Sequence, residues 1–391
     1  MNDRSTAATL TSAAMLARLV AFDTTSRNSN LPLVDFVRDW LDRHGVPHRL
    51  GHNEAGDKAN IHAVIGPAVQ GGIALSGHVD VVPVDGQSWS GDPFTLRAEN
   101  GRLYGRGAAD MKGFVACALA AVPELVARPL VRPMHLFITF DEETTMAGAR
   151  RLVADLAAGA LRPMFCVVGE PSSMQPILGH KGRLALRVTA RGRPGHSSEP
   201  GKGVNAIHAL GAVIAHITAE QRRFAMEGPF DPRFDPPCTT PHIGTVQGGS
   251  ILNIIPERAS LTMEWRTVPA DDFFAEVERL RAHVAAHIAP WMQAIDPATG
   301  IDLEVMDWIP GMSLPGEHAL ATLVKQAAGA NGAGFVAYGT EGGLYEAAGI
   351  PSIVCGPGDI AQAHQPDEWI AEAQLAACDG FIRRLADRLC A

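Results

Sequence analysis

Residues 73–83 read IALSGHVDVVP, an apolar run that leads directly into a histidine and an aspartate. Two more apolar runs, MHLFITF at 134–140 and MFCVV at 164–168, are also followed by acidic residues. Short apolar runs with little alternation are typical of strands buried on both faces. Between the first two runs, residues 110–126 are rich in Ala and Leu, as expected for a helix. Strands alternating with helices predict an α/β domain with a mixed, mostly parallel sheet.

The pattern changes near residue 181. The segment RLALRVTAR at 183–191 alternates apolar and polar residues, as a strand buried on one side does. The following segments predict a β-α-β-β-α-β order, which is the ferredoxin-like unit: helix 204–223, strands 241–247 and 257–266, helix 271–288 and strand 301–306. After residue 310 the α/β pattern resumes. We therefore expect a first domain in two parts, 1–180 and 310–391, interrupted by an α+β domain at 181–309.

Composition excludes several classes of protein. The 391 residues are 46% hydrophobic and carry a net charge of −9, which argues against disorder, nucleic-acid binding and attachment to anionic membranes. We find no apolar stretch near the roughly 18–20 residues that a membrane-spanning helix needs. The N-terminus lacks the features of a secretory signal and predicts a polar lead-in to an amphipathic helix. The six scattered Cys favour buried free thiols, so we expect a cytoplasmic protein.

Acidic residues and histidines gather where the apolar runs end. They are His78 and Asp80 in SGHVDVVP, Asp110 in GRGAADMKG, Glu142 and Glu143 in FDEET, Glu170 in VVGEP, and His364 in AQAHQPDE. Any one of them alone is compatible with a capping or solvated side chain. In open α/β sheets, however, ligands bind beyond the carboxyl ends of strands, where these residues would converge. Carboxylates brought together there would repel one another, and divalent cations such as Zn²⁺ would neutralise them.

The number of ligands fits two ions. Two metals about 3.5–4 Å apart can share one carboxylate and need about five protein ligands. The sequence supplies that set: His78, Asp110, Glu143, Glu170 and His364. Glu142 then remains beside a ligand, where a general base belongs. Asp80 lies two residues from His78 and is placed to orient its imidazole.

Over nearly its full length the chain resembles the M20 family of dinuclear zinc amidohydrolases and peptidases. The resemblance rests on SGHVDVVP, FTLRAENGRLYGRGAADMKG, the Glu-Glu pair, VVGEP, GHSSEPGKGVNAI and the late His364. It implies that His78 and Glu170 bind one metal, that Glu143 and His364 bind the other, and that Asp110 bridges them. It also implies that the inserted domain is a lid and dimerisation module of a homodimer. His196 would then reach the partner's active site to polarise the scissile carbonyl.

The resemblance also implies a substrate class. FDTTSRNSNLPLVDFV and VVGEPSSMQPILGHKGRLALRVTARG look most like the acetylornithine deacetylase branch, so the leading substrate is N²-acetyl-L-ornithine. Two zinc ions, with cobalt as the alternative, would support its hydrolysis to L-ornithine and acetate in arginine biosynthesis. Residues matched to the substrate pocket are Asn253, Arg266, Lys181, Thr340 and Gly342. Another acylase, a desuccinylase or a carboxypeptidase is the alternative within the family. A non-catalytic binding protein on the same scaffold is the alternative outside it.

Some positions depart from that branch or have simpler interpretations. Thr144-Thr145-Met146 after the Glu pair, and Pro194-Gly195 before His196, differ from the branch pattern, which leaves substrate preference open. Asn253 is compatible with capping a turn, Arg266 with pairing a nearby Glu, and His196 with a polar turn. The segment GRGAAD lacks the full GxGxxG of a dinucleotide site. His283 and His287 have metal-like i, i+4 spacing, but a solvated helix face explains them better.

Overall fold

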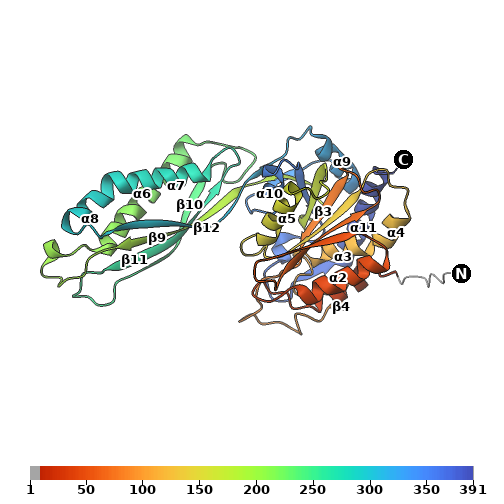
Figure 1. Cartoon of the computed structure of the whole chain (residues 1–391), viewed down its shortest axis with the longest axis horizontal. Coiled ribbons are helices and arrows are strands. Elements are labelled where there is room, and N and C mark those ends of the chain that lie inside the picture. Colours follow the sequence, from red (N-terminus) through yellow and green to blue (C-terminus); the bar gives the residue numbers. More distant parts are fainter. Residues whose placement is uncertain (1–8, 391) are drawn as a thin grey trace. The chain divides into compact units, whose positions relative to one another are not determined.

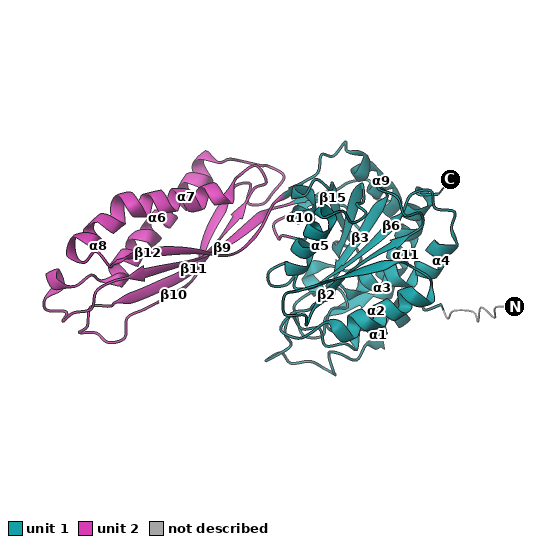
Figure 2. Ribbon diagram, in the orientation of Figure 1, with its two compact units in different colours: residues 1–179, 312–335, 340–391 teal, residues 180–311, 336–339 magenta. Residues whose placement is uncertain are grey.

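The structure is a computed structural model that describes residues 9–390. Most of the polar lead-in predicted at the N-terminus lies outside these residues. The chain divides into two compact units (Figure 2). Unit 1 comprises the chain up to residue 179 together with residues 312–335 and 340 onward, and unit 2 comprises residues 180–311 and 336–339.

Unit 1 is built on one large mixed sheet (Figure 1), with strand order β1-β2-β6-β3-β7-β15-β8-β13 and β14 paired to β8. The four central strands β6, β3, β7 and β15 run parallel, and antiparallel pairs flank them. The predicted α/β class with a mixed, mostly parallel sheet is confirmed. The strands are β1 (His48–His52), β2 (Ala59–Ile65), β3 (Ile73–His78), β6 (Met134–Thr139), β7 (Phe165–Pro171), β8 (Ile177–His180), β13 (Met312–Ser313), β14 (Gly334–Val336) and β15 (Ser352–Gly356).

Two groups of helices pack in unit 1. Helices α1, α3, α9 and α11 form one connected group, and α5 and α10 contact each other. A small sheet of three strands lies beside them in the order β16-β5-β4. The elements are α1 (Ser12–Val20), α2 (Leu31–Arg43), α3 (Lys112–Ala120), α4 (Val122–Ala127), α5 (Ala147–Ala157), α9 (Ala319–Ala328), α10 (Gly342–Ala347), α11 (Glu372–Asp387), β4 (Arg97–Glu99), β5 (Arg102–Tyr104) and β16 (Trp369–Ala371).

The apolar runs form strands because they are buried throughout. Every residue of β3 and of β6 is buried, which explains why these segments show no alternation. Strand β7 extends further than the predicted 164–168 and carries Glu170 within it. The helix predicted at 110–126 is instead two helices that meet at Ala121. Pro123 in the first turn of α4 has no N–H to continue the helical hydrogen bonds, so a new helix begins there.

Unit 2 has the element order β-α-β-β-α-β and a four-stranded antiparallel sheet in the order β10-β11-β9-β12. Leu184, Leu186 and Val188 alternate inward from β9 into a core shared with α6 and α7. The elements are β9 (Gly182–Arg191), α6 (Ala206–Glu227), β10 (Thr240–Gly248), β11 (Arg258–Thr267), α7 (Phe273–His283), a π-helical turn (Val284–Ile288), α8 (Ala289–Ile295) and β12 (Gly300–Ile309).

The helix predicted at 271–288 is longer and irregular. It leaves the α-helical form at Val284, passes through the π-helical turn and continues as α8 to Ile295. Pro290, in the first turn of α8, cannot donate a backbone hydrogen bond, and the hydrogen-bond pattern changes just before it.

Two other structural facts bear on the sequence expectations. Within residues 9–390, none of the helices combines the length and the apolar character needed to cross a membrane. All six cysteines lie in the described chain as free thiols, and all but Cys390 are buried.

Candidate metal centre

The predicted ligands come from five different segments of unit 1. His78 ends β3, and Glu170 lies in β7 beside it. Asp110 lies in the turn before α3, Glu143 follows β6, and His364 follows a short 3-10 turn at Ile360–Gln362. The parallel strands β3, β6 and β7 are neighbours, so their carboxyl ends deliver these side chains to one edge of the sheet.

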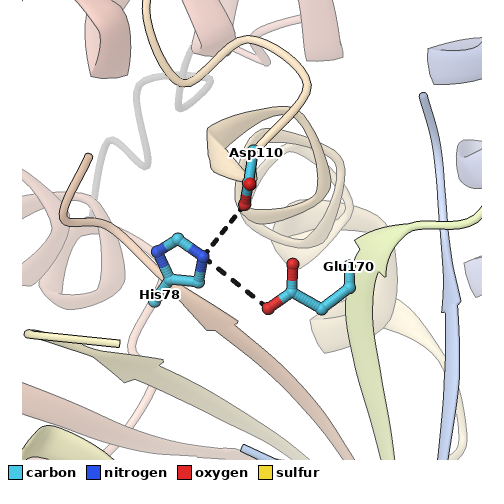
Figure 3. Close-up of side chains that lie close together, drawn as sticks. All are labelled: His78, Asp110 and Glu170. Carbon is cyan, nitrogen blue, oxygen red and sulfur yellow. Dashed lines mark hydrogen bonds and ion pairs between the residues drawn. The ribbon is translucent and has the colours of Figure 1, made fainter. Parts of the chain in front are cut away.

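One group of three side chains is buried at this edge (Figure 3). His78 Nε2 lies 3.1 Å from Asp110 Oδ1 and 3.7 Å from Glu170 Oε1. The ligand atoms of the three residues all lie within 4.8 Å of one another. An imidazole and two carboxylates at this spacing can supply three ligands to a divalent cation.

A second group shares Asp110 with the first. His364 Nε2 lies 3.2 Å from Asp110 Oδ2 and 3.2 Å from Glu143 Oε2. The two oxygens of Asp110 therefore face different groups, Oδ1 toward His78 and Oδ2 toward His364. This is the arrangement that a carboxylate bridging two ions requires. The structure thus brings the five predicted ligands together as two groups of three joined at Asp110.

Glu142 lies next to these groups and belongs to neither of the two found among the described residues. Its Oε2 is 3.9 Å from His78 Nε2, and its side chain is 11% exposed. Burial, and then repulsion from Glu170, raises the pKa of Glu142 well above its ordinary value. A carboxyl group that lies beside the two groups without belonging to either is placed to accept and return a proton.

Asp80 connects His78 to the loop that carries both glutamates. His78 Nδ1 lies 3.0 Å from the Asp80 carbonyl oxygen and 3.5 Å from its Oδ1. The Asp80 carboxylate also accepts the backbone N–H groups of Glu142 and Glu143, at 3.0 and 3.2 Å. Burial alone would raise the pKa of Asp80, but hydrogen bonds from His78 and from the Ser26 hydroxyl hold it below its ordinary value. Asp80 therefore orients the Glu142–Glu143 loop as well as the imidazole.

The unfavourable electrostatics of the site indicate how it is completed. Asp110, Glu143 and Glu170 are all largely buried, and burial, then repulsion from Asp110, raises the pKa of Glu143 and of Glu170. Within residues 9–390, Glu170 Oε1 has no hydrogen-bond partner. Hydrogen bonds with Asp110 and Glu143 raise the pKa of His364 to about 10, which shows that the cluster attracts positive charge. Divalent cations would remove both the repulsion and the unpaired acceptor, so these residues fit a two-metal site.

The predicted pocket residues are divided between the units. Thr340 and Gly342 are buried in unit 1, where the Gly342 N–H donates to Thr340 Oγ1 at 3.1 Å. The other three, Lys181, Asn253 and Arg266, lie in unit 2, as does the predicted catalytic residue His196. Lys181 is buried and its Nζ donates to the Cys238 carbonyl at 2.7 Å.

Within unit 2 the backbone brings two distant motifs together. The Ser197 N–H donates to the Asn253 carbonyl at 3.1 Å, so exposed His196 and exposed Asn253 lie on neighbouring segments. Arg266 Nε donates to Glu264 at 2.9 Å, which is the pairing with a nearby Glu that the sequence left open as the alternative to substrate binding. Glu264 also accepts from Arg183, so Arg266 is part of a surface ion network.

Sequence reasoning missed several residues that shape the centre. Ser26 donates to Asp80 Oδ2 at 2.7 Å, and Lys58 pairs with Asp141 in the loop before Glu142. Glu368 lies four residues after His364 and accepts hydrogen bonds from the segment that carries Asp110. Its acidic side chain close to a predicted ligand was a usable signal, but its partners are more than 250 residues away in the chain.

Two histidine–carboxylate groups that share one aspartate at the carboxyl ends of parallel strands are the arrangement expected of a metal-dependent hydrolase. The sequence profile of peptidase family M20/M25/M40 matches residues 74–388. The chain belongs to this family, as the sequence motifs predicted, and is a metal-dependent hydrolase.

Individual relatives agree with the family assignment. The chain is 35% identical over 377 residues to an acetylornithine deacetylase of Photorhabdus laumondii, covering 95% of this chain and 93% of the relative. It is 34% identical over 382 residues to one of Myxococcus xanthus, covering 96% and 97%. An aminopeptidase from Bacillus cereus shares the fold with a TM-score of 0.75 at 18% identity, covering 98% and 100%. An M20 family metallo-carboxypeptidase from Sulfolobus solfataricus does so with 0.74 at 18% identity, covering 99% of each chain.

Proposed function

We propose that the protein removes the acyl group from an N-acyl-L-amino acid, with N²-acetyl-L-ornithine as the leading substrate. The products would be L-ornithine and acetate, a step of arginine biosynthesis. One observation carries the proposal: a full set of five ligands with a spare carboxylate, Glu142, occurs in a chain whose relatives along 95% of its length are described as acetylornithine deacetylases.

In this proposal two divalent ions occupy the two groups, zinc by preference and cobalt as the alternative. His78 and Glu170 would hold one ion, Glu143 and His364 would hold the other, and Asp110 would serve both groups. Bound there, such ions make water more acidic and polarise an amide carbonyl.

Glu142 is the proposed general base. Its position beside both groups and outside each of them allows its carboxylate to take a proton from the attacking water. The same carboxyl then gives that proton to the departing amine nitrogen. Asp80 keeps Glu142 in place through the backbone N–H that it accepts.

His196 is proposed to assist from the partner subunit of a homodimer. His196 Nδ1 lies 3.2 Å from the Ser198 backbone N–H and 2.7 Å from the Ser198 hydroxyl, so in the neutral imidazole that accepts from this N–H the ring hydrogen is on Nε2. An exposed imidazole with a free Nε2–H can donate to a carbonyl oxygen as negative charge develops there.

The homodimer is supported by an apolar groove in unit 2. The groove measures about 790 Å³ and is lined by Ile207, Ile251, Leu252, Ile254 and Trp291, among others. Leu252 is 98% exposed and Ile251 is 59% exposed. Contiguous apolar surface of this kind is typical of an interface, and β10 beside it is an edge strand. A second copy of the chain is the proposed occupant.

A substrate panel tests the proposed activity. Protein loaded with zinc or cobalt would be offered N-acetylornithine, N-acetylmethionine, N-succinyl-diaminopimelate and a glutamate-terminated dipeptide, with Glu142→Gln as the inactive control. We expect the fastest turnover with N-acetylornithine. Turnover of another member without turnover of N-acetylornithine would assign the chain to a different branch of the family. Failure of the wild type to bind any divalent ion would favour the non-catalytic alternative.

A further inference from the structure

A buried carboxylate outside both metal groups organises the turn that carries Asp110. The Glu368 side chain is 1% exposed, and each of its oxygens accepts two hydrogen bonds. Oε1 accepts the N–H groups of Ala109 and Asp110, at 2.9 and 3.0 Å. Oε2 accepts the Gly107 N–H at 3.0 Å and Arg106 Nη1 at 2.7 Å. The backbone before the shared ligand is therefore wrapped around one carboxylate.

Arg106 extends this arrangement to the second metal group. Its guanidinium is also buried, and its Nη2 donates to Gln87 Oε1 at 2.5 Å. Gln87 Nε2 in turn donates to the carbonyl oxygen of His364 at 3.1 Å. A continuous chain of hydrogen bonds thus joins the backbone of Asp110 to the backbone of His364 through three side chains.

His364 needs such support because its backbone is in an uncommon conformation. Its φ is +61°, in the left-handed region that residues other than glycine rarely adopt. Surrounding interactions must over-determine such a residue for it to persist. The Gln87 hydrogen bond supplies one such interaction directly at the His364 carbonyl, while the imidazole reaches Asp110 and Glu143.

We propose that Glu368, Arg106 and Gln87 are positioning residues that hold Asp110 and His364 at the spacing needed to share an ion. This inference rests on the proposed two-metal site. Glu368 and Gln87, at the two ends of the network, hold different ligands. Glu368 holds Asp110, which belongs to both groups, whereas Gln87 holds His364, which belongs to only one. Loss of Gln87 should therefore weaken one ion selectively, and loss of Glu368 should weaken both.

The test compares the apo-forms of wild type, Gln87→Leu and Ser90→Ala. Each is titrated with Co²⁺ while the visible absorption and the number of bound ions are recorded. Ser90→Ala is the matched control because it removes a 2.6 Å hydrogen bond to Asp367 in the same loop but outside the network. We expect two ions in wild type and control. In Gln87→Leu we expect one ion bound as in wild type and the other bound about 10- to 100-fold more weakly.

Turnover gives a second readout. Gln87→Leu should have a low kcat at limiting Co²⁺ that recovers at saturating Co²⁺, with KM unchanged. Equal weakening of both ions in Gln87→Leu, or wild-type affinity for both, would overturn the inference while leaving the proposed site intact. A wild-type protein that bound no Co²⁺ would instead overturn the proposed site itself.

Glu368→Gln extends the test to Asp110. The amide can no longer accept four hydrogen bonds, so both ions should bind more weakly, while Glu368→Asp should recover part of the affinity because it keeps the charge. Circular dichroism and the melting temperature of the apo-forms show whether each variant folds. A folded Glu368→Gln with wild-type affinity for both ions would contradict the proposal, and Gln87→Leu decides the question if Glu368→Gln does not fold.

Discussion

At the scale of single residues, two adjacent glutamates, Glu142 and Glu143, face different partners in the centre. Glu143 faces Asp110 and His364, whereas Glu142 faces His78 and joins neither group of the described residues. The same Asp80 carboxylate accepts both of their backbone N–H groups, so the two side chains are oriented together. A metal ligand and a proton carrier can therefore occupy consecutive positions.

Glu142→Gln should remove activity and leave metal binding unchanged. The amide keeps the size of the side chain but cannot carry the proton, so kcat should fall by about 10²- to 10⁴-fold. Steady-state kinetics and the metal content of the purified variant measure the two effects. Retention of most of the activity, or loss of metal together with activity, would show that Glu142 is not the base.

Only some residues of the site could be predicted from the sequence. Histidine and carboxylates directly after apolar runs were recognisable because strand ends are set by local sequence. The roles of Glu368 and Ser26 were not recognisable, although Glu368 lies close to a predicted ligand, because these roles depend on partners that only the folded chain brings near them. For Arg266 the sequence left two interpretations open, and the structure shows the pair with Glu264.

At the scale of elements, α3 packs closely on β7 next to Glu170. Gly169 precedes Glu170 in β7, and a Cβ placed on it would lie 1.9 Å from the Phe114 ring of α3. Only glycine allows the two elements to approach this closely. The sequence pattern predicted both elements, because β7 begins with a short apolar run and the segment of α3 is rich in Ala and Leu. It did not predict two interruptions. One is the break at Ala121, two residues before Pro123, and the other is the π-helical turn, which ends two residues before Pro290.

Gly169→Ala should therefore destabilise the protein and displace Glu170. Overpacking of a core costs about 1–3 kcal/mol, and the free energy of unfolding in urea measures it. Gly211→Ala in α6 is the control, because nothing lies within 4 Å of its added Cβ. That substitution should stabilise the helix by about 0.5–1 kcal/mol. Equal stability of the two variants would contradict the packing argument.

At the scale of the whole molecule, the metal centre links segments that are far apart in the chain. His78 lies in the first segment of unit 1 and His364 in its last, and unit 2 comes between them in the sequence. Bound ions that contact both would stabilise the folded state only, because the unfolded chain has no such site.

Removing the ions should therefore lower both activity and the melting temperature. At a free ion concentration 100 times Kd the stabilisation is about 2.7 kcal/mol per site. Scanning calorimetry before and after treatment with a chelator measures it, and added Zn²⁺ or Co²⁺ should restore both properties. A melting temperature that does not respond to the ions would contradict the proposed ligands.

The proposed homodimer should depend on the apolar groove of unit 2. Leu252 is 98% exposed, and Leu252→Asp places a charge there, so the variant should yield monomers in light-scattering measurements after size-exclusion chromatography. Val126→Asp is the control, because Val126 is 46% exposed on α4 in unit 1 and is not one of the residues that line the groove. A Leu252→Asp variant that stays dimeric would place the interface elsewhere.

If His196 acts across that dimer, two inactive variants should restore activity to each other. In a mixed dimer of His196→Ala and Glu142→Gln, one site has both its own Glu142 and the partner's intact His196, whereas the other site has neither. Subunits mixed in equal amounts that exchange freely between symmetric dimers should then give about a quarter of the wild-type activity. The activity should increase with the fraction of mixed dimers. Different tags on the two variants allow that fraction to be measured. If His196 served its own subunit, every site in the mixture would lack one of the two groups, and activity would stay at the level of the separate variants.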